Sequence, residues 1–137
     1  MKTQLQAEDY DALASFRYAM RKFLCVSKVT LAAEGGLTPE QYEALLAMRA
    51  FRNSHGLNIG ELSERLQVKH HTAVSLAGKL VARKLVKRKP GARDRRQIYL
   101  HLTPGGESLL ARVAAFHRQE LRIRSAEMID ALVRLQK

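Results

Sequence analysis

Apolar residues recur at helical spacing over much of the chain, and glycine and proline separate these stretches. The first stretch runs from about residue 8 to residue 33 and ends at Glu34-Gly35-Gly36. Because no glycine or proline interrupts it, this stretch predicts one long amphipathic helix. The apolar positions of the helix are Leu13, Phe16, Met20, Leu24 and Leu31.

Two capping signals indicate where further helices begin. Thr38-Pro39-Glu40-Gln41 offers an N-cap, a proline suited to the first helical position and a capping-box glutamine. After a predicted turn at residues 52–56, Asn58 and Glu61 repeat the capping-box spacing ahead of a short helix. A longer helix is predicted from about His70 to Lys84. Two helices joined by so short a turn predict a helix-turn-helix. The inner face of the second helix is predicted to contain Ala73, Leu76, Ala77 and Leu80.

A β-hairpin is predicted next. Residues 85–89 form a short, partly apolar run that Pro90-Gly91 interrupts, and residues 97–102 alternate apolar with more polar side chains. Thr103-Pro104 then begins a helix to about residue 123, and Ser125 is an N-cap candidate for a last helix. The expected fold is therefore mainly α: a winged helix-turn-helix with a two-stranded β wing, flanked by helices at both ends.

The charge is concentrated in one part of the chain. The length of 137 residues suits one domain with additional arms, and the formal net charge is +11. Eleven lysines and arginines but only one acid, Asp94, lie between Arg65 and Arg96, so this stretch carries nearly all of the net charge. A basic footprint of this kind favours a polyanion as partner, and a merely solubilising face is the alternative.

The predicted second helix of the helix-turn-helix offers polar side chains for a DNA major groove. An α-helix fits that groove and reads bases with donors and acceptors at its exposed N-terminal end. Thr72 is expected to contact a thymine methyl or a phosphate, and Lys79 a phosphate. No acid lies on this helix. The candidate recognition residues are Lys69, His70, His71, Thr72, Ser75 and Lys79.

The tip of the predicted wing is suited to a minor groove, where arginine gains from the enhanced negative potential. Asp94 precedes Arg96 by two residues and is expected to hold its guanidinium in position. The alternative is that Asp94 forms the turn, and both roles are compatible. The candidate wing residues are Arg88, Lys89, Arg93, Asp94, Arg95 and Arg96.

These residues resemble the multiple-antibiotic-resistance regulators, the MarR family of winged helix-turn-helix transcription regulators. The resemblance covers about residues 37–110 and rests on LTPEQYEALL, LNIGELSERLQV, HHTAVSLAGKLVARKLVKR and DRRQIYLHLTPGGESLL. The last stretch is specific to the wing of the family and the helix after it. The chain departs from the family at Lys84, where glycine is common, and at Gly78, where aspartate is frequent.

The resemblance implies a homodimer built from the first and last helices, with residues 1–36 and 104–137 as dimerisation regions around a DNA-binding domain at residues 37–103. It further implies repression from an inverted-repeat operator in double-stranded DNA, and release by a small phenolic or lipophilic effector. Phe16, Met20 and Phe116 are candidates for an effector pocket, with core packing as the alternative. The expected dimerisation residues are Leu13, Phe16, Met20, Leu121, Ile129 and Leu132.

Other functions have less support in the sequence. No catalytic motif appears, and the five histidines, His55 among them, do not form a metal-ligand set, so neither an enzyme nor a cofactor is predicted. Cys25 is expected to be a buried inert thiol, with redox sensing as the alternative. Without a membrane span, a signal peptide or a disulfide framework, the expected location is the cytoplasm.

Two alternatives to a repressor remain open. A basic winged helix can serve as an interaction module that binds an acidic protein or RNA, and preference for a duplex sequence would separate the two. An activator or nucleoid-like protein is a further alternative, because the position of an operator relative to its promoter decides between activation and repression.

Overall fold

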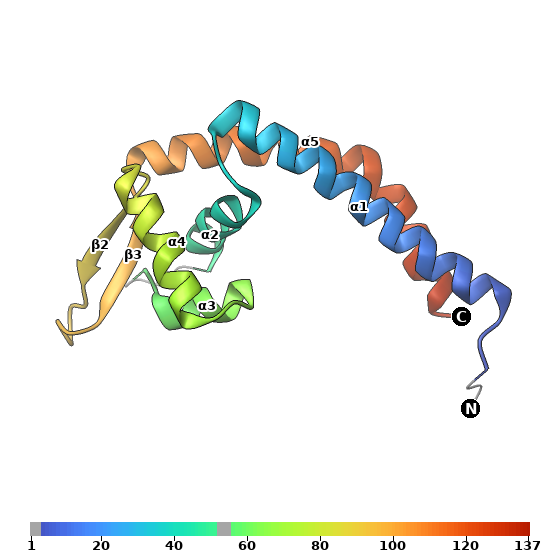
Figure 1. Cartoon of the computed structure of the whole chain (residues 1–137), viewed down its shortest axis with the longest axis horizontal. Helices are drawn as coiled ribbons and strands as arrows, with labels where there is room; N and C mark the ends of the chain where they lie inside the picture. The colour runs from blue at the N-terminus through green and yellow to red at the C-terminus, as the bar shows by residue number, and fades with distance from the viewer. Residues whose placement is uncertain (1–3, 52–55) are drawn as a thin grey trace. The chain divides into compact units, whose positions relative to one another are not determined.

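The computed structural model describes residues 4–51 and 56–137 (Figure 1). Contacts divide the chain into two compact units, a helical unit (Met1–Thr30 with Ala114–Lys137) and a winged-helix unit (Leu31–Val113). Their elements are α1 (Ala7–Gly35), α2 (Pro39–Ala50), β1 (Leu57–Asn58), α3 (Ile59–Leu66), α4 (His70–Ala82), β2 (Val86–Pro90), β3 (Ile98–Leu102) and α5 (Pro104–Leu135).

The sheet of the winged-helix unit has three antiparallel strands in the order β1-β3-β2. The predicted hairpin is present, with Lys87 opposite His101 and Arg88 opposite Leu100. This hairpin is the predicted two-stranded wing, and β1 adds to the sheet a third strand that was not predicted, by pairing Leu57 with Leu100. A strand of only two residues, directly before a capped helix, leaves no alternating pattern to detect in the sequence.

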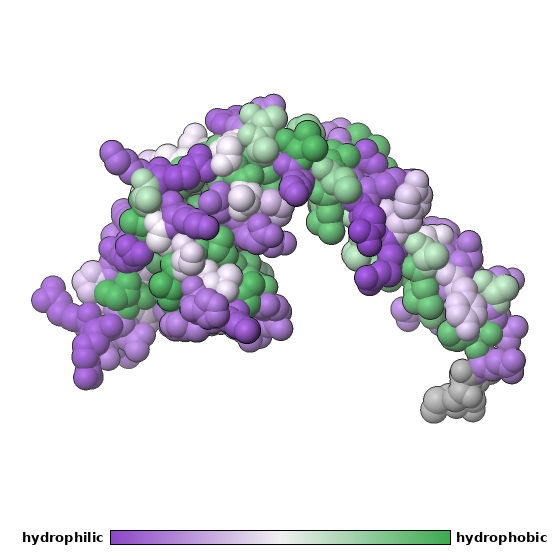
Figure 2. All heavy atoms as spheres, in the orientation of Figure 1, coloured by the Kyte–Doolittle hydropathy of each residue, from purple (hydrophilic) through white to green (hydrophobic). Residues whose placement is uncertain are grey.

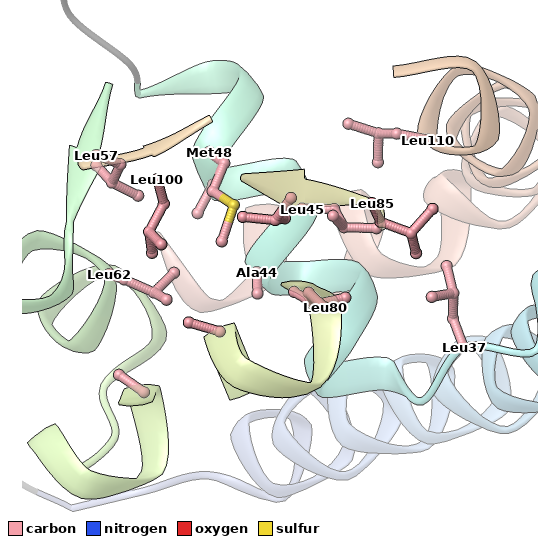
Figure 3. Close-up of a cluster of buried hydrophobic side chains, with 14 of the residues drawn as sticks. Leu37, Ala44, Leu45, Met48, Leu57, Leu62, Leu80, Leu85, Leu100 and Leu110 are labelled. Atoms are coloured by element: carbon pink, nitrogen blue, oxygen red, sulfur yellow. The ribbon is translucent and has the colours of Figure 1, made fainter. Parts of the chain in front are cut away.

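The core of this unit lies between α2, α3, α4 and the sheet, where leucines from all of these elements converge (Figure 3). Leu45, Leu57, Leu62, Leu80 and Leu100 are almost completely buried. The four residues predicted for the inner face of α4, Ala73, Leu76, Ala77 and Leu80, are all buried, which confirms the predicted orientation of this helix.

The caps that orient the helices are those that the sequence predicted. The Thr38 side chain accepts from the backbone N–H of Gln41, and Asn58 accepts from that of Glu61, each within a complete capping box. The helix α4 ends at Ala82, two residues before the predicted end. The reason is that Lys84 adopts a left-handed φ of 61°, and a right-handed helix cannot continue through a residue in that conformation.

In the helical unit, the N-terminal part of α1 and the C-terminal part of α5 run antiparallel. Asp11 pairs with Arg134 at 2.7 Å, and Lys22 pairs with Glu127 at 3.1 Å. Nearer the other end of α1, Ser27 Oγ and His117 Nε2 form a buried hydrogen bond of 2.7 Å. Partners therefore fall along α5 in the reverse of their order along α1.

The prediction of two helices after the wing was wrong, because α5 is continuous from Pro104 to Leu135. Serine is tolerated inside a helix at a small cost, so Ser125 did not have to begin a new one. An ion pair of 3.0 Å between Glu120 and Arg124, four residues apart, reaches the predicted junction and supports the helix there.

Among the described residues, no helix is both long enough and apolar enough to span a lipid bilayer. Most of the turn predicted at residues 52–56, including His55, lies outside the described residues.

Candidate nucleic-acid interface

The helix α4 presents a polar face opposite the face that it buries. Lys69, His70, His71, Ser75 and Lys79 are exposed, and Thr72 is half-buried. The N-cap residue Lys69 makes no side-chain cap hydrogen bond, and no acid lies in the first turn. The N-terminus of the helix therefore combines amides without a side-chain cap, the positive end of the helix dipole and a lysine, a combination that favours an anion.

One flank of α4 lines a hollow of about 370 Å³ together with the first turn of α2. Thr72, Ser75 and Lys79 line it from α4, and Thr38 and Glu40 line it from α2. Thr72 thus lies beside α2, to one side of the most exposed strip of α4. Glu40 therefore places a carboxylate beside α4, although α4 itself carries no acid.

At the tip of the wing, Asp94 holds Arg96. Asp94 Oδ1 accepts from the Arg96 backbone N–H at 3.0 Å and from Arg96 Nε at 3.3 Å. Both roles considered for Asp94, forming the turn and orienting the guanidinium, are therefore present. Because the Arg96 side chain is 93% exposed, this ion pair adds little stability and acts mainly on orientation.

Gly91 makes this tight tip possible. A Cβ at Gly91 would lie 2.6 Å from the Asp94 carbonyl oxygen, so the backbone approaches too closely for any other residue. The Gly91 N–H donates to the Gln97 carbonyl at 2.8 Å and closes the turn. The tip carries Arg93, Arg95 and Arg96, all exposed, and Figure 2 shows hydrophilic side chains gathered there.

The other two predicted wing residues, Arg88 and Lys89, point to opposite faces of β2 because side chains alternate along a strand. Arg88 Nη2 lies 3.8 Å from the position that a Cβ at Gly78 would occupy, so Arg88 reaches α4. Lys89 instead lines a separate hollow of about 120 Å³ with Lys87 and His101. The structure therefore brings Arg88, but not Lys89, to the exposed face of α4.

Besides Arg96, two arginines of the basic stretch contact other parts of the protein. The Arg83 guanidinium donates to the Gly36 carbonyl at 2.9 Å and to the Gly35 carbonyl at 3.0 Å. Arg65 Cζ lies 3.9 Å from the centre of the Phe51 ring, a cation–π contact. The sequence analysis counted both arginines toward a polyanion site. In the structure Arg83 caps the C-terminus of α1 and Arg65 stacks on an aromatic ring.

The two departures from the family pattern have different consequences. Lys84 occupies a left-handed conformation that glycine adopts without cost, so its side chain strains the turn between α4 and β2. Its carbonyl oxygen accepts a 2.7 Å hydrogen bond from the Thr103 hydroxyl, which holds this turn against the start of α5. Gly78 lies in regular helix, where an added Cβ would meet only ordinary contacts.

In the helical unit, the predicted dimerisation residues are mostly exposed. Ile129 is 57% exposed, and Leu13, Leu121 and Leu132 are also exposed, whereas Phe16 and Met20 are half-buried. Further large apolar side chains are exposed on the same two helices, including Ile123 and Val29. In Figure 2, apolar side chains are visible at the surface along both long helices of this unit.

The remaining candidates give weaker signals. Phe116 was a candidate for an effector pocket, with core packing as the alternative. It is exposed and makes an edge contact with the buried His117, so it is not a core residue. The expectation that Cys25 is buried was wrong, because its thiol is exposed on α1. The described residues contain no group of three or more histidine, cysteine or acidic side chains placed to hold a metal ion.

Comparison with known proteins identifies transcription regulators. The HTH-type transcriptional repressor MdtR of Bacillus subtilis is 28% identical over 109 residues, which cover 71% of this chain and 68% of MdtR. A putative transcriptional regulatory protein for the hcr operon of Thauera aromatica is 29% identical over 102 residues, 74% of this chain and 60% of that protein.

Solved structures share the fold. A mutant of MepR from S. aureus, bound to an oligodeoxyribonucleotide, superimposes with a TM-score of 0.67 at 24% identity over 89% of this chain and 84% of that one. BpsR of Bordetella bronchiseptica, solved in a study of how 6-hydroxynicotinic acid regulates its DNA binding, superimposes with a TM-score of 0.68 at 22% identity, covering 88% and 86% of the two chains.

A family model agrees with these similarities. Residues 35–97, which contain the helix-turn-helix and the tip of the wing, match the model of the MarR family. The matched residues run from α2 through β2 to the wing tip, where Asp94 and Arg96 are in contact, and β3 follows directly after them. The family model, the two curated relatives and the solved structures all indicate the MarR family.

Proposed function

We propose that this chain is a DNA-binding transcription regulator that recognises an inverted repeat as a homodimer. In this proposal α4 enters the major groove through Lys69, His70, His71 and Ser75, and the wing tip enters the adjacent minor groove through Arg96. Thr72 and Lys79, on the flank of α4, contact the phosphate backbone. The protein acts in the cytoplasm, without catalysis, and most directly by excluding polymerase from a promoter.

One observation carries this proposal: a basic surface links α4 to the wing. From Lys69 to Arg96 the only acid is Asp94, and its carboxylate is engaged by Arg96. Arg88 spans the interval between the two elements, because its guanidinium lies against α4 at Gly78. A DNA duplex bound to this surface therefore contacts cations from both α4 and the wing. No unpaired acid lies between these two elements.

The exposed apolar side chains of the helical unit support the homodimer. Monomeric proteins rarely expose large contiguous apolar patches, so residues such as Leu13, Leu121, Ile129 and Leu132 call for a partner surface. A two-fold dimer requires a self-complementary patch, and two helices per protomer supply one. We expect the two half-sites of the inverted repeat for such a dimer to lie about one helical turn, or roughly 10 bp, apart.

A small effector is a further part of the proposal. Phe116 is exposed and Phe16 and Met20 are half-buried, so apolar surface is accessible on the helical unit. The ligand of BpsR, a hydroxylated aromatic acid by its name, supports a small aromatic class of effector. A screen of phenolic and aromatic acids for release of bound DNA tests this part separately.

The experiment that tests the function is fluorescence anisotropy against a duplex selected from a random pool and against its scrambled version, over a series of salt concentrations. A specific regulator is expected to bind the selected duplex roughly 10³-fold more tightly or better, with a gap that persists as salt rises. Equal binding to selected DNA, scrambled DNA, RNA and heparin would instead identify an electrostatic interaction module and overturn the proposal.

A further inference from the structure

One side chain of α4 does not fit the polar character of its exposed face. Val74 is 45% exposed, although Ala73 and Leu76 beside it are buried. No other large apolar residue of α4 is exposed, because Leu76 and Leu80 are buried and Val81 packs partly against the core. Valine is also a poor helix former, so neither packing nor propensity accounts for this choice at a solvent-facing position.

The position of Val74 on the helix is specific. It lies one turn after His70 and one turn before Gly78, on the same side of α4. Val74 is absent from the lining of the hollow toward α2, which Thr72 and Lys79 share. The side that it occupies is the one facing the wing, since Arg88 reaches α4 at Gly78. Val74 therefore lies between the polar N-terminal residues of α4 and the basic wing.

The shape of this strip suits a base edge. Gly78 has no side chain, and the nearest atom to the position of a Cβ there is Arg88 Nη2 at 3.8 Å, so the helix surface next to Val74 carries only this guanidinium. In the major groove, the thymine C5-methyl group is the apolar feature of the base-pair edges, and apolar side chains recognise it. A valine on a helix side that also carries His70 and the approach of Arg88 therefore matches a methyl group beside acceptors and phosphates.

We infer that Val74 is a specificity-determining residue that contacts a thymine methyl group in each half-site. The inference rests on the proposed binding of α4 in the major groove. It moves the methyl contact from Thr72, which the structure places beside α2, to Val74. Because Val74 is uncharged, it contributes to the choice of sequence and not to the electrostatic attraction for DNA.

The test replaces thymines of the selected duplex, one per half-site, with deoxyuridine, which removes only the C5-methyl group. Wild-type protein is expected to lose affinity at one thymine position, by about fourfold for each buried methyl group. Val74→Ala is expected to bind the thymine duplex less tightly by a similar factor and to bind thymine and uracil duplexes alike. Its salt dependence is expected to stay that of wild type, because no charge changes.

Leu46→Ala is the matched control, because Leu46 is similarly exposed but lines a different hollow, with Phe51 and Arg65. This variant is expected to retain the uracil sensitivity of wild type. If every uracil substitution is silent, or if Val74→Ala keeps the full sensitivity, the inference is overturned while the proposed function stands. If selected and scrambled duplexes bind alike, both are overturned.

Discussion

The winged-helix unit and the helical unit distribute their apolar side chains in opposite ways. In the winged-helix unit, leucines, valines and a methionine are buried in one cluster. Among the described residues of the helical unit, only Ala12, Ala19 and Ala131 are buried apolar residues. Of the sixteen large apolar side chains exposed among the described residues, twelve belong to the helical unit, although it is the smaller of the two.

This difference separates a unit that completes its own core from one that does not. The small buried residues let α1 and α5 pack closely, but they remove little apolar surface from water. The large residues that would stabilise a core, such as Ile123 and Ile129, are exposed. The winged-helix unit therefore has a surface free for a charged ligand, and the helical unit has a surface suited to a second copy of itself.

The largest expected effect comes from Ile129→Asp in the helical unit. A carboxylate in the proposed dimer interface would be buried without a partner, so the variant is expected to sediment as a monomer. Affinity for an inverted repeat is expected to fall by about 10²-fold or more, because the second half-site no longer binds intramolecularly. Analytical ultracentrifugation and anisotropy measure the two effects. Leu46→Asp, at an exposed apolar position of the winged-helix unit, is the control and should remain dimeric. If Ile129→Asp also remains dimeric, Ile129 does not lie in the dimer interface.

A smaller effect is expected at the wing tip. Arg96→Ala should weaken binding by about 1–3 kcal/mol and reduce the salt slope by about one, as loss of a cation from a groove does. Asp94→Ala should weaken binding less and leave the salt slope unchanged, because it releases Arg96 without removing its charge. Anisotropy over a salt series measures both. Wild-type affinity in either variant at moderate salt would contradict the role of the wing.

Arg83→Ala and Lys79→Ala separate structural from DNA-facing cations in the winged-helix unit. Arg83 donates to two carbonyls at the end of α1, so its loss is expected to lower stability by about 1–2 kcal/mol and leave the salt slope unchanged. Lys79 is exposed, and its loss is expected to reduce the slope by about one with little change in stability. Thermal unfolding and salt titration measure these quantities, and the opposite pattern would reverse the two assignments.

The smallest effect is a gain. Lys84→Gly is expected to raise the free energy of unfolding by about 1 kcal/mol, because glycine adopts the left-handed conformation without a Cβ clash. Gly36→Ala is the matched opposite change, since Gly36 has a φ of 58°, and it should be destabilising. Chemical denaturation measures both. A loss of stability in Lys84→Gly would mean that the lysine side chain has a structural role.

The sequence predicted the features that depend on local spacing. The capping boxes at Thr38 and Asn58, the buried face of α4 and the hairpin all follow from short-range patterns, and the structure confirms them. The contact of Asp94 with Arg96 was also predictable, because two residues of separation in a turn bring these side chains together.

The features that the sequence missed depend on distant partners. Arg83 binds the end of α1, 47 and 48 residues away, and no local signal distinguishes it from an arginine facing DNA. The strand β1 is defined only by its pairing with β3. The continuity of α5 was missed because serine is compatible with both an N-cap and a helix interior.

The most direct test of the central claim, that two winged-helix units joined through their helical units read one inverted repeat, changes only the spacing of the selected duplex. Inserting about 5 bp between the half-sites turns them to opposite sides of the duplex, and about 10 bp returns them to the same side. Anisotropy is expected to show a large loss of affinity for the first insertion and a partial recovery for the second. Equal affinity for all three spacings would contradict the claim, because each unit would then bind DNA independently.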